Sequence, residues 1–157
     1  MNPCPCGYLG DTNRSCRCTP ESIARYQGKI SGPLLDRIDM LVPVAALSTD
    51  DILCSDTGEP SAAIAQRVFN ARAIQRARQE KNNTELSVKD IDHFCAPNTE
   101  AEGLLRSAMN KIQWSARAYR RVLKLARTIA DIAHNESITA THVAEAIQYR
   151  RALSTQR

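Results

Sequence analysis

The chain has 157 residues, of which 43% are hydrophobic, 24% charged and only 4% aromatic, with a formal net charge of +4 at pH 7. This length suits one ordinary globular domain, or a small domain with an appendage. No window approaches the ~18 consecutive apolar residues that a membrane span needs, so we expect no membrane partner. The mild positive charge allows a nucleotide or nucleic-acid partner without requiring one. Because aromatic residues are scarce, a core of Leu, Ile, Val and Ala is expected, which favours packed helices.

The first part of the chain, residues 1 to about 60, is rich in Pro, Gly, Cys and Asp, as is typical of turns and short ordered pieces. Residues 21–29 predict a short helix, and residues 33–37 predict a brief helical turn with its proline at a tolerated early position. Residues 38–44 (IDMLVPV) are the one good strand candidate. Their Ile, Leu and Val favour a pleated, buried setting, and Pro43 marks an end or an edge.

Four cysteines form two Cys-x-Cys clips, Cys4-Pro5-Cys6 and Cys16-Arg17-Cys18, with nine residues between them. Four thiolates around one Zn²⁺ make a closed structural site, and a loop of this length can fold back so that both clips meet. The alternative is four reduced thiols in a surface loop, or a disulfide formed after purification. Since no His or Glu accompanies the four cysteines, we expect a structural zinc ion and not a catalytic metal, with the ligands Cys4, Cys6, Cys16 and Cys18.

The start of the chain, Met1-Asn2-Pro3-Cys4, has neither a basic run nor an apolar stretch behind it, so we expect no signal peptide and a cytoplasmic location. In a reducing cytosol, clustered thiols are metal ligands more often than disulfides. Cys54 and Cys95 lie apart from the clips, and we interpret them as small hydrophobic residues.

From about Ser61 onward, the pattern predicts four or five helices in series. A long helix begins at Ser61 and ends at Asn82-Asn83, and Ser87 with Asp90 resembles the capping box of the next helix. Three further helices are expected after the cap residues Asn98, Ser115 and Thr139. The apolar stripes expected to face the core are Ala65, Val68, Ala71 and Ile74 in the first helix, Val122, Leu125, Ile129 and Ile132 after Ser115, and Val143, Ala146 and Ile147 in the last.

Three short strings carry a more specific message: Met1-Asn2-Pro3, residues 31–39 (SGPLLDRID) and residues 115–119 (SARAY). With the Cys-x-Cys pair and residues 138–146 (ITATHVAEA), they resemble the Mg-chelatase-like AAA+ ATPases of bacteria, of the ComM/YifB type, and more distantly the MCM helicases. The likeness runs over nearly the whole chain.

The resemblance implies a mainly α fold in three parts. Residues 1–60 would be the remnant of an α/β AAA+ core with a Cys-rich, zinc-binding loop, residues 61–150 an all-helical lid domain, and residues 151–157 a frayed tail. We expect the helical region from about Ser61 to fold on its own. The first 60 residues should be less well ordered, because the strand at 38–44 lacks sheet neighbours.

The resemblance also assigns roles to three residues. Asn2 corresponds to sensor 1, which orients the attacking water, and Arg37 to the arginine finger, which reaches a neighbouring subunit's nucleotide. Arg117 corresponds to the sensor 2 arginine, which contacts the γ-phosphate from the lid. Guanidinium groups suit both of the latter roles, because they stabilise phosphoryl charge with paired, directional hydrogen bonds.

The residues by themselves leave other interpretations open. Arg37 can pair with Asp36 or Asp39 at the surface, and Asn2 before Pro3 can be an ordinary turn former. Arg117 can belong to a solvated basic helix face, together with Arg120, Arg121, Lys124 and Arg127.

The chain departs from the family in one respect. These ATPases need Gly-x-x-x-x-Gly-Lys-Ser/Thr to cradle the phosphates and an acidic strand end to hold Mg²⁺, and neither motif occurs here. We therefore expect the rear portion of a larger ATPase, from a truncated gene or a partial sequence, that does not hydrolyse ATP alone. ATP and Mg²⁺ are expected only in the parent. That parent would be a ring homo-oligomer, expected to be a hexamer, acting as a DNA helicase or branch-migration factor in natural transformation.

Two other functions compete with this one. The first is a stand-alone, zinc-stabilised helical module that binds DNA or a protein partner. The second is a chelatase subunit that helps to insert Mg²⁺ into a porphyrin, for which the residues offer no support. The helix from Ser61 carries basic residues, but no aromatic platform for bases is interleaved, so strong DNA contact by this chain itself is not expected. These basic residues are Arg67, Arg72, Arg76, Arg78 and Lys81.

Overall fold

The computed structural model describes residues 2–11, 14–44, 47, 53, 58–112 and 114–154, with the side chains of 151–154 left aside. The fold is mainly α, as predicted, and within these ranges only one isolated parallel bridge, Pro97 to Ile138, has β character. No helix in the described part is long and apolar enough to cross a bilayer. The elements are α1 (Pro20–Gln27), α2 (Gly32–Leu35), α4 (Ser61–Gln79), the 3₁₀ turn η1 (Asn83–Glu85), α5 (Val88–Phe94), α6 (Thr99–Ile112), α7 (Ala116–Ile132) and α8 (Ala140–Ser154).

Side-chain caps explain where most of these helices begin. An oxygen of the residue before the helix accepts a hydrogen bond from a backbone N–H of the first turn, which would otherwise be unsatisfied. Ser87 and Asp90 form the predicted capping box of α5, and the five helices expected after residue 60 are all present. The capping residues are Thr19 for α1, Ser31 for α2, Ser87 for α5, Asn98 for α6 and Ser115 for α7.

The strand predicted for residues 38–44 is wrong. These residues run as coil, and their backbone contact with the helical region is the Leu41 N–H donating to the Tyr149 carbonyl of α8 at 3.1 Å. A β-strand needs a neighbouring strand to complete its ladder, and the described residues supply none. The β-branched residues of this stretch favour a strand, but the described residues offer no sheet for that strand to join.

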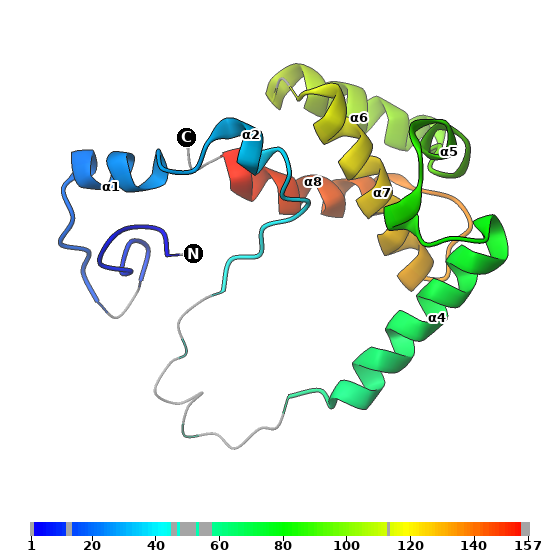
Figure 1. The fold of residues 1–157 in the computed structure, drawn as a ribbon, viewed down its shortest axis with the longest axis horizontal. Coiled ribbons are helices and arrows are strands. Elements are labelled where there is room, and N and C mark those ends of the chain that lie inside the picture. Colours follow the sequence, from blue (N-terminus) through cyan, green and yellow to red (C-terminus); the bar gives the residue numbers. More distant parts are fainter. Residues whose placement is uncertain are drawn as a thin grey trace.

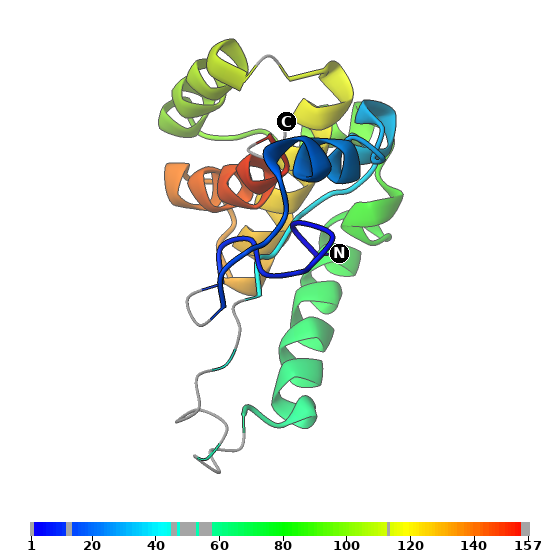
Figure 2. The same cartoon turned by 90° about the vertical axis from the view of Figure 1, so that its left-hand side faces the viewer.

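The hydrophobic core lies within the helices that follow residue 85. Helix α7 packs against α8, α4 and α5, and α6 also packs against α8 (Figures 1 and 2). Leu105, Val122, Ile138 and Val143 are fully buried there, and burial of each such side chain stabilises the fold by about 1.5–3 kcal/mol. Cys95 is also fully buried in this core, as expected for a small hydrophobic residue, and burial raises the pKa of its thiol to about 11. Cys54 lies outside the described residues.

Helix α4 projects from this core, and its predicted apolar stripe is only half used. Ala71 is buried and Ile74 is half-buried, whereas Ala65 and Val68 nearer the N-terminal end are exposed. Figure 1 shows the N-terminal end of α4 far from the other helices. Ile132 of α7 is likewise 48% exposed, although Val122 on the same predicted stripe is buried.

A buried polar network anchors the C-terminal end of α4. Asp131 of α7 is fully buried and accepts hydrogen bonds from Arg78 at 2.6 Å, Asn83 at 2.8 Å and Arg127 at 3.0 Å. Arg127 also donates to the Glu136 carbonyl, which ties down the loop before α8. Because every member is satisfied by several partners, the network fixes α4 and η1 against α7.

Candidate functional site: a basic pocket on helix α7 and a cysteine cluster

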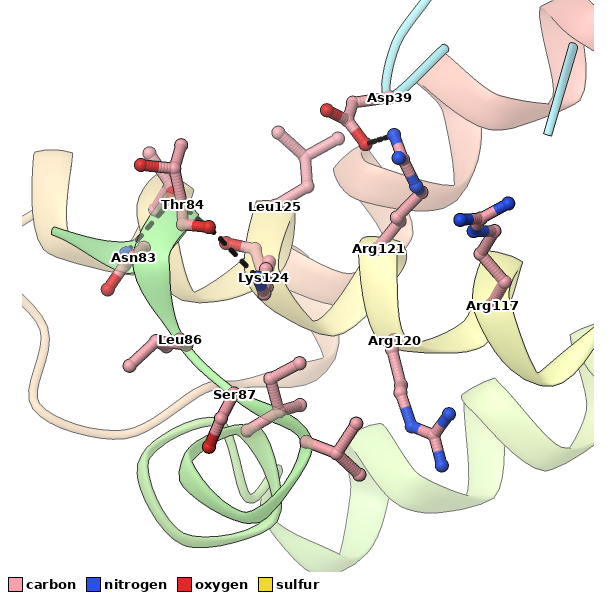
Figure 3. A pocket seen from close by; sticks show the side chains of 13 residues that line it. Asp39, Asn83, Thr84, Leu86, Ser87, Arg117, Arg120, Arg121, Lys124 and Leu125 are labelled. Carbon is pink, nitrogen blue, oxygen red and sulfur yellow. Dashed lines mark hydrogen bonds and ion pairs between the residues drawn. The ribbon is translucent and has the colours of Figure 1, made fainter. Parts of the chain in front are cut away.

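A pocket of about 630 Å³ opens where α7 faces η1 and the start of α5 (Figure 3). Positions 117, 120, 121 and 124 recur at helical spacing, so one side of α7 presents a row of cations to it. Four apolar side chains contribute to the rest of the lining. The cations are Arg117, Arg120, Arg121 and Lys124, and the apolar residues are Leu86, Val88, Ile91 and Leu125.

The four cations differ in their partners. Lys124 donates to the Thr84 carbonyl at 3.1 Å, and Arg121 is paired with the Asp39 carboxylate. Arg117 is exposed, and neither it nor Arg120 has an ion-pair or hydrogen-bond partner among the residues that the structure describes. In Figure 3, Arg117 lies beside Arg121, whereas Arg120 points away from both. An unpaired guanidinium beside an apolar wall can accept an anionic group with an attached apolar part.

The basic residues that sequence alone groups on α7 do not form one solvated face. Arg127 is only 3% exposed and serves the buried network, and burial lowers its pKa. The basic residues of α4 and of the turn after it divide in the same way. Three of the five are engaged, Arg67 with Glu59, Arg78 with Asp131 and Lys81 with Asp90, while Arg72 and Arg76 stay exposed.

Arg37 lies in the turn that follows α2 and its side chain is exposed. The suggested surface pairing with Asp36 or Asp39 is absent from the described contacts, and each aspartate has another partner. Asp39 pairs with Arg121 of α7, and Asp36 pairs with Arg150 of α8 at 3.5 Å. The Arg37 side chain therefore has no ion-pair partner within the described part of the chain.

Asn2 lies in the cysteine-containing loop, exposed and next to Gly7. Gly7 has φ +85°, a left-handed conformation that favours glycine, and its N–H closes a turn on the Cys4 carbonyl at 3.0 Å. Among described residues, no hydrogen bond or ion pair joins Asn2 to Arg37 or Arg117. The structure thus links the Arg37 turn to α7, and leaves Asn2 apart from both.

The four cysteines of the two clips converge. Their sulfur atoms all lie within 4.8 Å of one another, with Cys4 Sγ 3.4 Å from Cys6 Sγ and 3.6 Å from Cys16 Sγ, and all are free thiols. Tetrahedral zinc with Zn–S bonds of 2.3 Å separates its sulfur ligands by about 3.8 Å. The four residues could therefore hold a metal ion, and the set of four soft thiolate donors fits zinc.

Hydrogen bonds from the backbone polarise this cluster. The amide groups of Tyr8 and Arg17 lower the pKa of the Cys6 thiol to about 6. At Cys16 the Cys18 amide lowers the pKa, but burial and the neighbouring sulfur atoms outweigh it and raise the pKa to about 12. Four adjacent sulfurs share negative charge poorly, so a divalent cation is the natural counter-charge for this set.

Nearby residues hold the cysteine loop in place. Gln27 of α1 donates from Nε2 to the Pro3 carbonyl at 3.0 Å. Arg14 donates to the Tyr8 hydroxyl at 2.8 Å and lies over its ring, 5.3 Å from the centroid. The loop is therefore hydrogen-bonded to α1.

Two residues that bind the Arg37 turn were not recognised from the sequence as anything more than positive charges. They are Arg121 and Arg150. The spacing of 117 and 121 places both residues on one helix face, which was a usable signal for Arg121. Nothing local marks Arg150, because its partners Asp36 and Ile38 lie more than 110 residues earlier.

Comparison with known proteins identifies the origin of these features. Residues 58–150 match the family model described as the C-terminal part of magnesium chelatase subunit ChlI, and residues 1–52 match the model for magnesium chelatase subunit ChlI. The chain is 41% identical over 152 residues to the competence protein ComM of Haemophilus influenzae, and 42% identical over 153 residues to the YifB protein of Escherichia coli. The YifB protein of Salmonella typhimurium is 39% identical over 153 residues.

Each of these alignments covers 96% of this chain but only 29% of the relative, so the chain spans less than a third of the length of these proteins. The matched stretch includes the cysteine clips, the Arg37 turn and the basic face of α7. On this evidence the chain belongs to the Mg-chelatase-like family of ComM and YifB, and corresponds to its ChlI C-terminal domain with the segment that precedes it.

Proposed function

We propose that this chain supplies the lid and the charge-stabilising arginines of an AAA+ ATPase. The phosphate-binding loop of that ATPase would lie on polypeptide outside these 157 residues. In this proposal Arg117 is the sensor 2 arginine, Arg37 is the arginine finger and Asn2 is sensor 1. The ATPase would be a cytoplasmic ring homo-oligomer, a hexamer, that uses ATP and Mg²⁺ to drive DNA unwinding or branch migration in natural transformation. The division into a core remnant over 1–60, a lid over 61–150 and a tail over 151–157 belongs to the same proposal.

The observation that carries the proposal is that the guanidinium groups of Arg37 and Arg117 are both unpaired among the described residues, and that Arg117 also borders a pocket. Arg117 borders a cavity that is lined both by cations and by apolar side chains, which suits the phosphates and the base of a nucleotide. Arg37 is exposed and unpaired among the described residues although two carboxylates flank it, and those carboxylates pair with Arg121 and Arg150. An arginine that is kept free at a surface is available to a nucleotide on an adjoining subunit.

We further propose that Cys4, Cys6, Cys16 and Cys18 hold a structural Zn²⁺. The four sulfurs leave no open ligand position, so the ion would brace the loop that carries Asn2 and would take no part in ATP chemistry.

The test is ATP turnover by the assembled ATPase, meaning this chain fused to or mixed with the polypeptide that carries the family's Gly-x-x-x-x-Gly-Lys-Ser/Thr loop. The isolated chain should show no turnover, and the assembled ATPase should hydrolyse ATP. Arg37→Ala should lower kcat by about 10³-fold or more, because an arginine finger contributes about 10³–10⁵ to the rate.

Mixing two inactive variants distinguishes a residue that acts across a subunit boundary. Rings that combine Arg37→Ala subunits with subunits lacking the lysine of the phosphate loop should regain activity at the interfaces where both functional residues meet. Turnover by the isolated chain, or full turnover by Arg37→Ala rings, would refute the proposal.

A stand-alone DNA-binding module remains the competing function, and Arg72 and Arg76, exposed one turn apart on α4, are the residues that favour it. Affinity of the isolated chain for duplex DNA that falls steeply with salt, and that is lost in Arg72→Gln/Arg76→Gln, would support the module.

A further inference from the structure

The turn that carries Arg37 is held by residues far away in the sequence. Arg121 Nη1 of α7 donates to the Arg37 carbonyl at 2.5 Å and to the Asp39 carboxylate. One guanidinium therefore grips both the backbone at Arg37 and the side chain two residues later. Because Arg121 contacts the Arg37 backbone and not its side chain, the backbone is held in place while the Arg37 guanidinium stays free.

The other side of the same turn is held by α8. Arg150 is only 5% exposed and donates to the Ile38 carbonyl, and its second terminal nitrogen lies 3.5 Å from Asp36. The Leu41 N–H adds a backbone hydrogen bond to the Tyr149 carbonyl at 3.1 Å. Burial lowers the pKa of Arg150, so the carbonyl and carboxylate that surround it are needed to compensate its charge.

We propose that Arg121 and Arg150 are positioning residues that aim Arg37 from the lid, a role that rests on the proposed function of Arg37 as an arginine finger. Arg121 lies one helical turn after Arg117 on the same face of α7, and Asp39 forms part of the pocket wall beside it (Figure 3). Helix α7 thus carries Arg117, proposed to contact a γ-phosphate, and also holds the turn of Arg37, proposed to reach a neighbouring subunit's nucleotide. A displacement of α7 would therefore move Arg117 and the Arg37 turn together.

The kinetic test compares Asp39→Asn with Arg121→Gln in the assembled ATPase. Asp39→Asn weakens the anchor without removing a cation from the pocket. If Arg121 positions the turn, both variants lower kcat about tenfold or more and leave KM unchanged, because small misplacements of a catalytic group are costly. Arg121→Lys should recover part of the loss, since an ammonium can still donate to the Arg37 carbonyl and Asp39. The control is Arg106→Gln, which removes an exposed ion pair on α6 that does not line the pocket.

A second measurement, on the 157-residue chain itself, reads the anchor without any ATP chemistry. Amide exchange in residues 36–41 should be faster in Arg121→Gln and Arg150→Gln than in Arg106→Gln, while exchange within α6 stays unchanged. This comparison keeps the inference testable if Arg150→Gln folds poorly, because Arg121 is partly exposed and its loss leaves the core intact.

The outcomes separate the two proposals. If Arg37→Ala abolishes turnover while Asp39→Asn and Arg121→Gln behave like Arg106→Gln, the positioning role is wrong and the finger stands. A raised KM in Arg121→Gln with a silent Asp39→Asn would make Arg121 a nucleotide contact and would also overturn it. If Arg37→Ala keeps full turnover, the proposed function itself fails.

Discussion

At the scale of single residues, Asp131 shows how completely this chain compensates a buried charge. Its two oxygens accept from Arg78, Asn83 and Arg127, and the neighbouring Gln75 and Gln79 side chains bind Asn83 in turn. Removing one member of such a network leaves charges buried without a partner, which costs more than the interaction contributes.

We expect Asp131→Ala to lower the free energy of unfolding by about 3–5 kcal/mol, because Arg127 would keep its charge in a dry setting. Urea denaturation followed by circular dichroism measures this change. Glu102→Gln is the matched control, since it breaks an exposed pair with Arg106 that contributes about 0.2–0.5 kcal/mol. Equal midpoints for the two variants would contradict the structure of the network.

The elements themselves follow from local chemistry, and the Ser87–Asp90 pair at the start of α5 is the clearest case. Asp90 accepts from the Ser87 N–H at 2.8 Å and from Lys81 at 2.6 Å. Lys81 first, and then Ser87, hold the pKa of the Asp90 carboxyl well below its usual range.

This pKa shift gives α5 a defined response to acid. The unfolded chain protonates Asp90 near its ordinary pKa of about 3.9, whereas the folded chain resists protonation. The stabilisation is therefore complete above about pH 4 and is lost as the pH falls through the lowered pKa. Thermal midpoints measured from pH 5 to pH 2 should fall less steeply in Asp90→Asn than in the unaltered chain, and parallel curves would count against the pairing.

Local signals also set the limit of what the sequence predicts. Caps and apolar spacing predict the five helices after residue 60, and the Cys-x-Cys spacing predicts the convergence of four thiols. The strand at 38–44 could not be excluded in this way, because its residue types favour a strand and only the absence of a partner prevents one. Likewise, no local pattern reveals Arg150 as the anchor of a turn more than 110 residues away, since that contact exists only after the helices have packed.

At the scale of the whole molecule, the chain has two separately ordered parts, the helical core and the cysteine loop. The hydrophobic core draws on residues 86–147, whereas Cys4 is the only residue of the first part that is fully buried among those described. The cysteine loop is hydrogen-bonded to α1, and the turn at 36–41 is the described connection between this part and α7 and α8. Metal binding and helical packing should therefore be separable.

We expect about one Zn²⁺ per chain in reduced, metal-replete protein, measured by elemental analysis. Removing it with a chelator should increase amide exchange in residues 4–18 and leave the cooperative unfolding of the helices nearly unchanged, because none of the core residues belongs to that loop. Cys16→Ser/Cys18→Ser should reproduce the effect of the chelator, while Cys95→Ala should retain the metal. A zinc content near zero, or a helical region that melts when the metal is removed, would refute this separation.

Helix α4 is held at one end only, so a small rotation there produces a large movement at the other end. Its 19 residues form a rod about 28 Å long, gripped at one end through Ala71, Gln75 and Arg78 and exposed over its first nine residues. A rotation of about 10° at the gripped end would move the far end by about 5 Å. Small rearrangements around Asp131 would thus be amplified into displacements of several ångströms at the N-terminal end of α4.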